Sequence, residues 1–533
     1  MNIKIALSQS NFVVGDIDGN IAKIKSEYAK SLQQGADLVV FSEMCITGYP
    51  PQDLILQKNF QSHAISALQS LAELTLGGAA ILCGGVDCVG DQIYNAAFLL
   101  DAGKISHIIH KHNLPNYGIF DEKRLFSQGE HPQTLDWRGH KLGILICEDV
   151  WHSEIAENFL NVDLQIAINA SPYEIGKVEK RAAVVKQFVA ITCKPFIYVN
   201  QIGGQDEIIF DGNSFVIDSH GKIIDKLAAF EEDFSVVEFP LLNDSQPKNT
   251  QKLEAEIYSA IKLGLHDYVN KNGFKSVILG LSGGIDSALV AAVAVDALGK
   301  QNVKAFMLPS PYTSQESLDD AALCAKMLGI EIESIDISAL MSGFEQALAP
   351  IFAGKPKDIS EENIQSRIRG NLLMAISNKE KSMLLTTGNK SEMAVGYATI
   401  YGDMCGGYNV LKDIYKTLVY RLAAWRNLQS PVIPERIITK APSAELRPDQ
   451  KDQDSLPPYD ILDAILELLI EQRLSASEII ANGFDTDTVN KVVRLLYLSE
   501  YKRFQSAPGA KITSMALGSD RRYPMTNKNR ENS

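Results

Sequence analysis

A glycine-rich junction at residues 276–287 is the part of the sequence best suited to bind an anion. A strand-length apolar run ends there at Ser282, two glycines follow, and a helical pattern begins after Asp286. The glycines allow a tight turn whose N–H groups face an anion, and the positive end of the helix dipole adds to the attraction. The loop lacks the Gly-x-x-x-x-Gly-Lys-Ser/Thr pattern of a Walker A loop. We therefore expect a phosphate-binding loop of another kind.

Two carboxylates accompany this loop. Asp286 belongs to it, and Glu392 follows a further apolar run at 383–386. A carboxylate beside phosphates is repulsive unless it binds a cation, so the pattern favours Mg²⁺. Glu392 or Lys412 alone would be interpreted as a solvated surface charge. Their order after a phosphate loop favours a nucleotide site instead.

The sequence Ser-Gly-Gly-Ile-Asp-Ser resembles the pyrophosphate-binding loop of ATP pyrophosphatases, and together with the later residues it resembles the NAD synthetase family. The resemblance implies amidation of deamido-NAD (nicotinic acid adenine dinucleotide) through an acyl-adenylate, with ATP cut between its α- and β-phosphates. It implies an ATP site of Gly280, Ser282, Gly283, Gly284, Asp286, Ser287, Thr387 and Lys412, the Mg²⁺ ligands Asp286 and Glu392, and a deamido-NAD site of Asn363, Arg367 and Asp403.

A loop also matches that family. Residues 440–447 resemble a mobile segment that closes over the site, and the match continues through 452–459. Gln453 stands where the family more often has Glu, so it receives no role.

The first half of the chain has residues suited to release ammonia. At neutral pH ammonia is mostly ammonium, which is not a nucleophile, so making it locally from glutamine requires an activated nucleophile and a base. Cys147 ends an apolar run, Glu43 ends another, and Lys111 lies in the segment 108–115. A buried cysteine alone is usually inert packing. A carboxylate and a lysine at comparable points favour catalysis.

Glu43, Lys111 and Cys147, with their flanking residues, resemble the nitrilase, or carbon–nitrogen hydrolase, superfamily. The resemblance implies an α-β-β-α sandwich. Glu43 would be the base for Cys147 and later for water, Cys147 would form a thioester with glutamine, and Lys111 would stabilise the oxyanion. The expected glutamine-binding residues are Tyr117, Glu148, Ser171 and Lys177, and Glu122 is a further candidate for holding glutamine or the lysine.

Two other chemistries are disfavoured in this half. His110 and His112 flank Lys111, but immediate neighbours in an extended segment point away from it. Zinc lacks support, because no Cys-x-x-Cys or His-x-x-x-His pair occurs at ligand spacing.

Two α/β domains must position these residues. In residues 1–245, helical patterns at 20–33 and 60–76 alternate with short apolar runs, which predicts helix-covered sheets. The predicted strands are 3–7, 38–41, 79–82, 142–146, 164–168, 196–199 and 214–217. In residues 251–525, strands at 276–281, 303–308, 332–337 and 383–386 alternate with helices, which predicts a doubly wound parallel sheet. The resemblance makes that sheet one of the adenine-nucleotide alpha hydrolase (Rossmann-like) type.

The connecting and terminal segments are polar. Residues 242–250, around Pro247, are interpreted as the linker, and 526–533 as a loose tail.

The composition sets the cellular context. Of 533 residues, 45% are hydrophobic and 22% charged, as in a packed protein, and the net charge of −14 argues against general nucleic-acid binding. Seven cysteines fit a reducing compartment, and neither a signal peptide nor a membrane-length apolar run is recognisable. We expect a cytoplasmic protein. The resemblance adds a homo-oligomer and an ammonia tunnel.

Two other functions stay open at this point. Another glutamine amidotransferase, for GMP or asparagine synthesis or tRNA thiolation, could use the same loop. GMP synthetase usually carries a Cys-His-Glu glutaminase, and a tRNA enzyme should show basic patches or zinc cysteine pairs. A non-catalytic nucleotide-binding scaffold is the second alternative, and the presence of Glu43, Lys111 and Cys147 argues against it.

Overall fold

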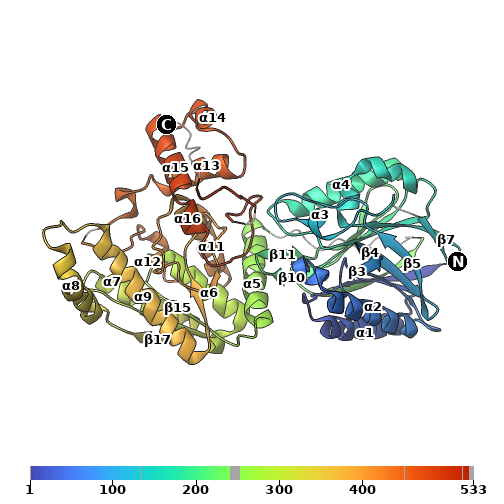
Figure 1. The fold of residues 1–533 in the computed structure, drawn as a ribbon, viewed down its shortest axis with the longest axis horizontal. Helices are drawn as coiled ribbons and strands as arrows, with labels where there is room; N and C mark the ends of the chain where they lie inside the picture. The colour runs from blue at the N-terminus through green and yellow to red at the C-terminus, as the bar shows by residue number, and fades with distance from the viewer. Residues whose placement is uncertain (1, 132–133, 241–251, 449, 519, 527–533) are drawn as a thin grey trace. The chain divides into compact units, whose positions relative to one another are not determined.

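The computed structural model describes residues 2–131, 134–240, 252–448, 450–518 and 520–526 (Figure 1). The chain divides into two compact units, 1–251 and 252–533. The linker expected at 242–250 lies outside the described residues, as does almost all of the expected tail. Within the described ranges, no helix is both long and apolar enough to cross a membrane.

Two six-stranded sheets form the centre of the first unit. The first has the order β14 (Asp233–Phe239), β1 (Ile3–Gln9), β2 (Leu38–Val40), β3 (Ala80–Val89), β4 (Gln92–Asp101), β5 (Lys104–His110). The second has the order β13 (Ile223–Lys226), β12 (Phe215–Ile217), β9 (Phe196–Asn200), β8 (Leu164–Asn169), β7 (His140–Ile146), β6 (Thr134–Trp137). A separate hairpin joins β10 (Ile202–Gln205) and β11 (Ile208–Asp211).

The sheets pack face to face because both carry alternating or continuous β-branched and leucine side chains. Leu7 and Val40 of one sheet and Ile144 and Ile166 of the other belong to one buried cluster. Figure 1 shows α4 (Lys177–Thr192) on one side of the two sheets, and α1 (Ile17–Gln33) and α2 (Lys58–Leu74) on the other. The unit is thus the expected α-β-β-α sandwich.

Strand direction brings the chemically interesting segments together. Strands β1, β2 and β3 are mutually parallel, and so are β7, β8 and β9. Strand β5 runs parallel to β3, since each is antiparallel to β4. The segments that follow β2 and β5 therefore leave the first sheet at the same edge.

The second unit contains a five-stranded parallel sheet. Its order is β17 (Glu331–Ser334), β16 (Val303–Met307), β15 (Val277–Gly280), β18 (Met383–Thr386), β19 (Tyr408–Asn409), and every pair is parallel. From β15 the chain continues to β16 and β17 on one side of the sheet. It then crosses to β18 and β19 on the other side of β15. The doubly wound prediction is confirmed, and the loops after β15 and β18 diverge at the switch point, where such sheets bind ligands.

Helices cover this sheet. Helix α6 (Ile285–Leu298) is apolar almost all round and buried, as a helix in the middle of a layer must be. Leu373 of α9 (Ile359–Glu380) packs on Ile278, Phe306 and Leu384 of the strands. The other helices are α5 (Leu253–Lys271), α7 (Gln315–Leu328), α8 (Ser338–Phe352), α10 (Lys390–Val395), α11 (Lys416–Gln429), α12 (Glu435–Thr439), α13 (Tyr459–Ile470), α14 (Ala476–Ala481), α15 (Thr486–Leu498) and α16 (Glu500–Arg503).

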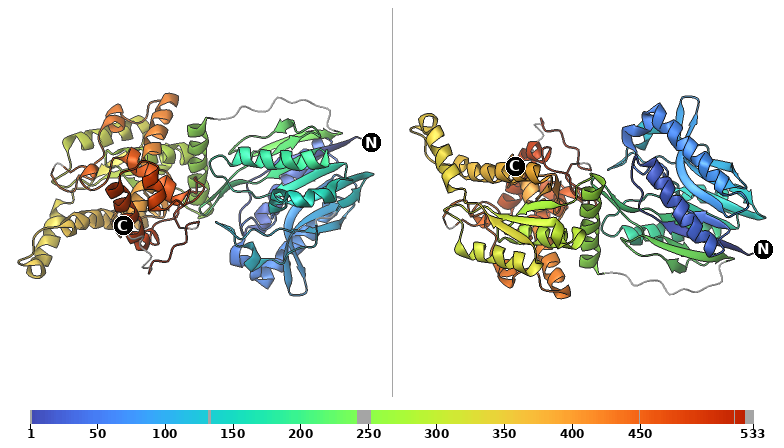
Figure 2. Two further views of the ribbon diagram at one scale, coloured as in Figure 1. Left: turned by 90° about the horizontal axis from the view of Figure 1, so that it is seen from above. Right: turned by 90° about the horizontal axis from the view of Figure 1, so that it is seen from below.

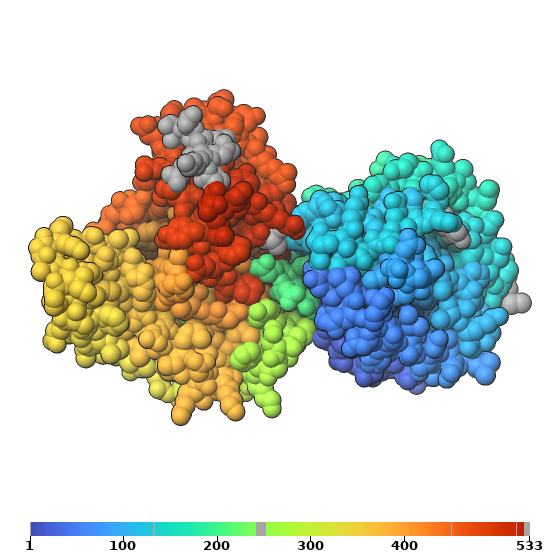
Figure 3. All heavy atoms as spheres, in the orientation of Figure 1, coloured from blue at the N-terminus to red at the C-terminus, as the bar shows by residue number. Residues whose placement is uncertain are grey.

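Helix α8 differs from these, because none of its residues is buried. The turned views of Figure 2 show it extending away from the body of its unit, and it lies at the surface, in yellow, in Figure 3. Leu340, Phe344 and Ile351 expose 43%, 47% and 65% of their surface.

Candidate functional sites

A buried ion cluster lies where β5 ends in the first unit. Nζ of Lys111 is 2.7 Å from Oε1 of Glu43 and 2.9 Å from Oε1 of Glu122, which begins the short helix α3 (Glu122–Leu125). Tyr49 donates a hydrogen bond of 2.7 Å to Glu122. All three charged residues are at most 3% exposed. Lys111 is therefore held by two carboxylates, and Glu122 takes the lysine-holding role considered for it.

Glu43 is fixed by three hydrogen bonds. Its Oε1 accepts from Lys111 and from Nδ2 of Asn95 at 2.7 Å, and its Oε2 accepts from the backbone N–H of Ala170 at 2.9 Å. Ala170 follows β8, so the second sheet contributes directly to the orientation of a carboxylate carried by the first. A carboxylate held by three hydrogen bonds does not have to reorganise before it takes part in a reaction.

Cys147 follows β7 and begins the short 3₁₀ helix Cys147–Trp151. Its φ of 44° is in the left-handed region, a strained conformation for a residue with a side chain. Burial, followed by the negative charge of Glu43, raises the pKa of its thiol. The resting cysteine is thus a neutral thiol, and it needs a base to become a nucleophile. The charges of Glu43, Lys111, Glu148 and Glu122 all act on it, which places them around one site.

The same charges set the state of Lys111 and Glu122. Burial alone would lower the pKa of Lys111, but Glu122 and Glu43 raise it, so the lysine stays protonated. Burial raises the pKa of Glu122 to about 7, against the opposing effect of Lys111. A permanent cation therefore sits beside the base in a dry environment.

The residues expected to bind glutamine surround this cluster in two groups. The hydroxyl of Tyr117 donates to Glu148 at 3.0 Å, and the ammonium of Lys177 lies 4.6 Å from the centre of the Trp151 ring. Burial lowers the pKa of Lys177, and the charge of Cys147 acts on it as well as on Tyr117. These residues are thus near the nucleophile.

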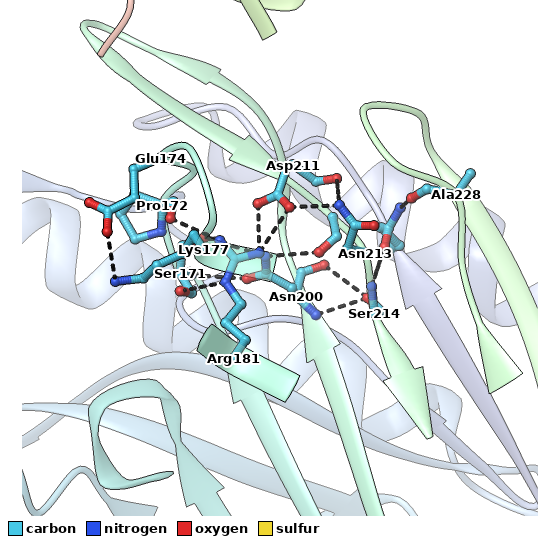
Figure 4. Close-up of polar contacts among 12 residues, drawn as sticks. Ser171, Pro172, Glu174, Lys177, Arg181, Asn200, Asp211, Asn213, Ser214 and Ala228 are labelled. Atoms are coloured by element: carbon cyan, nitrogen blue, oxygen red, sulfur yellow. Dashed lines mark hydrogen bonds and ion pairs between the residues drawn. The ribbon is translucent and has the colours of Figure 1, made fainter. Parts of the chain in front are cut away.

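Ser171 belongs to a second, polar group (Figure 4). Its Oγ accepts from Nε of Arg181 at 3.0 Å, and its N–H donates to Oδ1 of Asn200 at 2.9 Å. Arg181 is not among the site residues predicted from the sequence.

The two histidines beside Lys111 are engaged elsewhere. His110 stacks on Tyr94 and lies 2.7 Å from Asp87, while Nδ1 of His112 lies 3.0 Å from the carbonyl oxygen of Gly129. The contacts described for both rings are thus with residues other than Lys111.

In the second unit, a cavity of about 990 Å³ opens between the loops that follow β15 and β18. The predicted residues that line it are Gly280, Ser282, Gly283, Gly284, Asp286, Ser287, Asn363, Arg367, Thr387, Glu392 and Asp403. Lys412 is not part of this lining; it is buried, and its N–H donates to Asn409. Lys416, four residues later at the start of α11 and not selected from the sequence, lines the cavity instead. The assignment of Lys412 to the phosphates therefore lacks support in the structure.

The glycine-rich loop is held by its own serines. Oγ of Ser282 accepts from the N–H of Gly284 at 3.2 Å, and Oγ of Ser287 donates to the carbonyl of Gly284 at 3.1 Å. Gly283 has a φ of +80°, and a Cβ there would lie 2.3 Å from the carbonyl oxygen of Ser317. Only glycine fits this position, so the tight turn inferred from the sequence has a steric cause.

Lys416 joins the two acidic residues. Its Nζ contacts Oδ2 of Asp286 and lies 3.1 Å from Oε1 of Glu392, while Asn389 donates to the other Asp286 oxygen at 2.9 Å. Burial raises the pKa of Glu392 to about 7; Lys416 opposes this rise and the charge of Asp286 adds to it. The two carboxylates thus converge on a position that calls for positive charge.

This pair also bears on a magnesium site. Among the described residues, no group of three or more histidine, cysteine or acidic side chains could hold a metal ion by itself. Magnesium commonly takes only one or two protein carboxylates and completes its shell with phosphates and water. Asp286 and Glu392 fit that pattern beside a phosphate-binding loop.

The three residues expected at deamido-NAD gather around one segment. Oγ1 of Thr399 donates to Asn363 at 2.9 Å, the N–H of Thr399 donates to Asp403 at 2.6 Å, and Nε of Arg367 donates to the carbonyl of Ile400 at 3.3 Å. Burial raises the pKa of Asp403 to about 6. The tertiary structure thus assembles residues spread over 41 positions into one part of the cavity wall.

The segment expected to close over the site lines the cavity through Lys440, Glu445 and their neighbours. Glu445 accepts hydrogen bonds from Ser314 (2.9 Å), Ser317 (2.8 Å) and Lys440 (3.1 Å). Burial opposes their effect, but these bonds lower its pKa. Gln453 is exposed and is not among the lining residues described.

Comparison with known proteins gives the same division of the chain. Residues 4–243 match the model of the carbon-nitrogen hydrolase family, and residues 257–506 match that of the NAD synthase family. Glutamine-dependent NAD(+) synthetases of Acinetobacter baylyi and Rhodobacter capsulatus are 45% and 48% identical to this chain; both alignments cover 99% of the chain, and 98% and 99% of the relatives.

A solved structure is also similar to this chain over almost its full length. The glutamine-dependent NAD+ synthetase of Acinetobacter baumannii in complex with ADP superposes with a TM-score of 0.81 at 43% identity, over 99% of each chain.

Proposed function

Because the chain belongs to the family of glutamine-dependent NAD(+) synthetases, we propose that its two units perform the two halves of one synthesis. The first hydrolyses glutamine to glutamate and ammonia. The second uses ATP and that ammonia to convert deamido-NAD into NAD, with AMP and pyrophosphate as the other products. GMP or asparagine synthesis and tRNA thiolation are disfavoured, because the relatives match along nearly the whole chain.

In the first unit, Glu43 takes the thiol proton of Cys147 as its sulfur attacks the side-chain amide of glutamine. The ammonium of Lys111 stabilises the oxyanion that develops on the amide oxygen. Glu43 passes that proton to the amide nitrogen, ammonia leaves and a thioester remains. Glu43 then takes a proton from water as the water attacks the thioester carbonyl, and glutamate and the Cys147 thiol are released. The raised pKa of the Cys147 thiol makes a general base essential. Tyr117, Glu148, Ser171 and Lys177 are the proposed contacts for glutamine.

In the second unit, the nicotinate carboxylate attacks the α-phosphorus of ATP, and the bond to the β-phosphate oxygen breaks. Ammonia then attacks the acyl carbon of the adenylate, and AMP leaves with the bond electrons. Residues 282–284 and Lys416 line the cavity, and their amides and ammonium would face the phosphates, so positioning and charge neutralisation would do most of the catalysis. Asn363, Arg367 and Asp403 are the proposed contacts for deamido-NAD.

A magnesium ion is part of this proposal. Asp286 and Glu392 would hold it, and when bound it would neutralise phosphate charge and stabilise departing pyrophosphate. Lys416 supplies the positive charge between the two carboxylates when no metal is bound.

The proposal rests mainly on the presence of two sites in one chain. A buried Glu43–Lys111 pair acts on Cys147 in one unit, and a phosphate loop with paired carboxylates lines a cavity in the other. The test incubates the purified protein with deamido-NAD, ATP, Mg²⁺ and glutamine. NAD, AMP and pyrophosphate should form in equal amounts. ATP consumption that depends on GMP precursors or tRNA, and not on deamido-NAD, would replace the proposal.

Three properties stay predictions: the homo-oligomer and the ammonia tunnel implied by the resemblance, and the cytoplasmic location inferred from the sequence. A homo-oligomer is tested by light scattering, and the exposed apolar residues of α8 are the first surface to substitute. An ammonia tunnel is tested by the ratio of glutamine consumed to NAD formed, which channelling keeps close to one. A cytoplasmic location is tested by cell fractionation.

A further inference from the structure

Every N–H group of the Arg181 guanidinium is used within the first unit. Nε donates to Oγ of Ser171 at 3.0 Å, and Nη1 contacts the two carboxylate oxygens of Asp211 at 2.7 and 2.9 Å. Nη2 donates to the carbonyls of Ser171 and Pro172, both at 2.8 Å. Figure 4 shows the guanidinium between Asp211 and the Ser171–Pro172 backbone. Arg181 is 2% exposed and Asp211 is fully buried.

The backbone held by Arg181 leads directly to the catalytic base. Ala170 precedes Ser171, and its N–H donates to Oε2 of Glu43 at 2.9 Å. Asn200, at the end of β9, fixes the same segment from the other side, because it accepts from the N–H of Ser171 at 2.9 Å. Residues 170–172 are therefore a short bridge with Glu43 at one end and Arg181 at the other.

A buried ion pair is costly to form and is by itself weak evidence of stabilisation. Hydrophobic side chains of similar volume would fill the space beneath α4 at lower desolvation cost. Such side chains could not hydrogen-bond to two successive carbonyl groups and a serine hydroxyl, as the planar guanidinium of Arg181 does. The geometry is suited to holding a backbone segment in one place.

We propose that Arg181 is a positioning residue of the glutaminase site, acting through residues 170–172 on Glu43 and on Ser171. This inference rests on the proposed function of Cys147 and Glu43. Arg181 holds the Ala170 N–H against the base, and its Nε also fixes the position of the Ser171 hydroxyl, which accepts from it. Asp211 in turn orients the guanidinium.

The test compares two variants that weaken the bridge differently. Arg181→Lys keeps the charge but cannot make five fork-shaped contacts, and its kcat for glutamine hydrolysis should fall about 10- to 100-fold through misplacement of Glu43. Ser171→Ala leaves the Arg181 contacts to the backbone and to Asp211 in place, and it should mainly raise the KM for glutamine. Synthesis of NAD from ammonium salts should stay within about twofold of the wild type in both.

A stability control separates positioning from general destabilisation. Gln165 is fully buried on β8, the strand that leads into the bridge. Its Nε2 donates to Thr192, away from the bridge. Gln165→Met should lower the Tm without changing glutaminase kcat. If Arg181→Lys lowered only the Tm, as this control does, the inference would be wrong.

The outcome also distinguishes this inference from the function on which it rests. Cys147→Ala is assayed in parallel. Full glutamine use by Cys147→Ala would overturn the proposed glutaminase itself. An inactive Cys147→Ala together with an Arg181→Lys of unchanged kcat would overturn the positioning role alone. A fall in ammonium-supported synthesis in Arg181→Lys would also count against it, because the contacts described for the bridge are with residues of the first unit.

Discussion

Nζ of Lys111 lies 2.7 Å from Oε1 of Glu43, and neither side chain is more than 1% exposed. A lone carboxylate in such a dry place would take up a proton and cease to be a base. The ammonium of Lys111 offsets the cost of burying a negative charge at this place. In the proposed reaction, the same ammonium would also stabilise the oxyanion that forms when Cys147 attacks.

Replacing Cys147 with alanine should separate the two half-reactions. Without the sulfur no thioester can form, so glutamine-dependent NAD synthesis should fall at least about 1000-fold. Ammonium-supported synthesis should be retained, because the second site is untouched. Both rates are measured by NAD formation. Cys193 is exposed, and Cys193→Ala is the matched control. Retention of glutamine use would show that the nucleophile lies elsewhere.

The buried carboxyl of Glu122 makes stability depend on pH. Its pKa, about 7 in the folded protein, is above its ordinary value of 4.5, because burial disfavours the charge. The folded state thus binds this proton more tightly, and the stabilisation is fully present below pH 4.5 and is lost as pH rises through about 7. Relative to Glu122→Gln, the wild type should lose up to about 3 kcal/mol across this window.

Urea denaturation of both proteins at pH 4.5, 6 and 7.5 measures this difference. Glu73 is exposed on α2, and Glu73→Gln serves as the control whose difference from wild type should stay constant. A constant difference for Glu122→Gln as well would contradict the raised pKa.

Lys416 and Lys412 form a natural pair of variants. Lys416 contacts both Asp286 and Glu392, whereas Lys412 is absent from the described cavity lining. Lys416→Met should reduce NAD synthesis about 100-fold or more from either nitrogen source, because a cation facing the leaving pyrophosphate is lost. Glutamine hydrolysis by Cys147 should be far less affected. Steady-state rates with varied ATP measure both variants, and a larger loss in Lys412→Met would restore the assignment made from sequence.

Gly283 can be tested against a glycine of the same conformation. An alanine Cβ at Gly283 would lie 2.3 Å from the Ser317 carbonyl, whereas Gly273 has a φ of +78° and nothing within 4 Å. Gly283→Ala should displace the loop and weaken ATP binding about 10-fold or more. Gly273→Ala should cost only about 1–2 kcal/mol of stability from its φ, with ATP binding unchanged. Calorimetric titration with ATP and Tm measurements give both quantities, and equal binding in both variants would show that the loop tolerates a side chain.

Much of the fold follows from local pattern. Runs of β-branched and leucine residues at 38–41, 142–146 and 164–168 are strands with ends shifted by at most two residues. The strand predicted at 79–82 is longer in the structure, where β3 runs to Val89. Its second half is only partly buried and pairs with β4, so it lacks the continuous apolar run that marks the first half. Strand β5 is not among the predicted strands, because the exposed residues His107 and Ile108 interrupt the alternation of buried and exposed positions. Edge and surface strands depend on their partners more than on their own sequence.

The sequence by itself determined the kinds of chemistry in this protein. These chemistries are indicated by residue type and local turn geometry, which depend on neighbours in the chain. The two signals are Cys147 after a buried run, and the Ser-Gly-Gly-Ile-Asp-Ser loop with its carboxylates. Only the tertiary structure decided which groups meet. The chain has lysines at 412 and 416, and nothing local in the sequence shows that Lys416 contacts Asp286, 130 residues away. The Ala170 N–H reaches Glu43 across 127 residues. Such contacts are set by how strands and helices pack, and no local pattern records them.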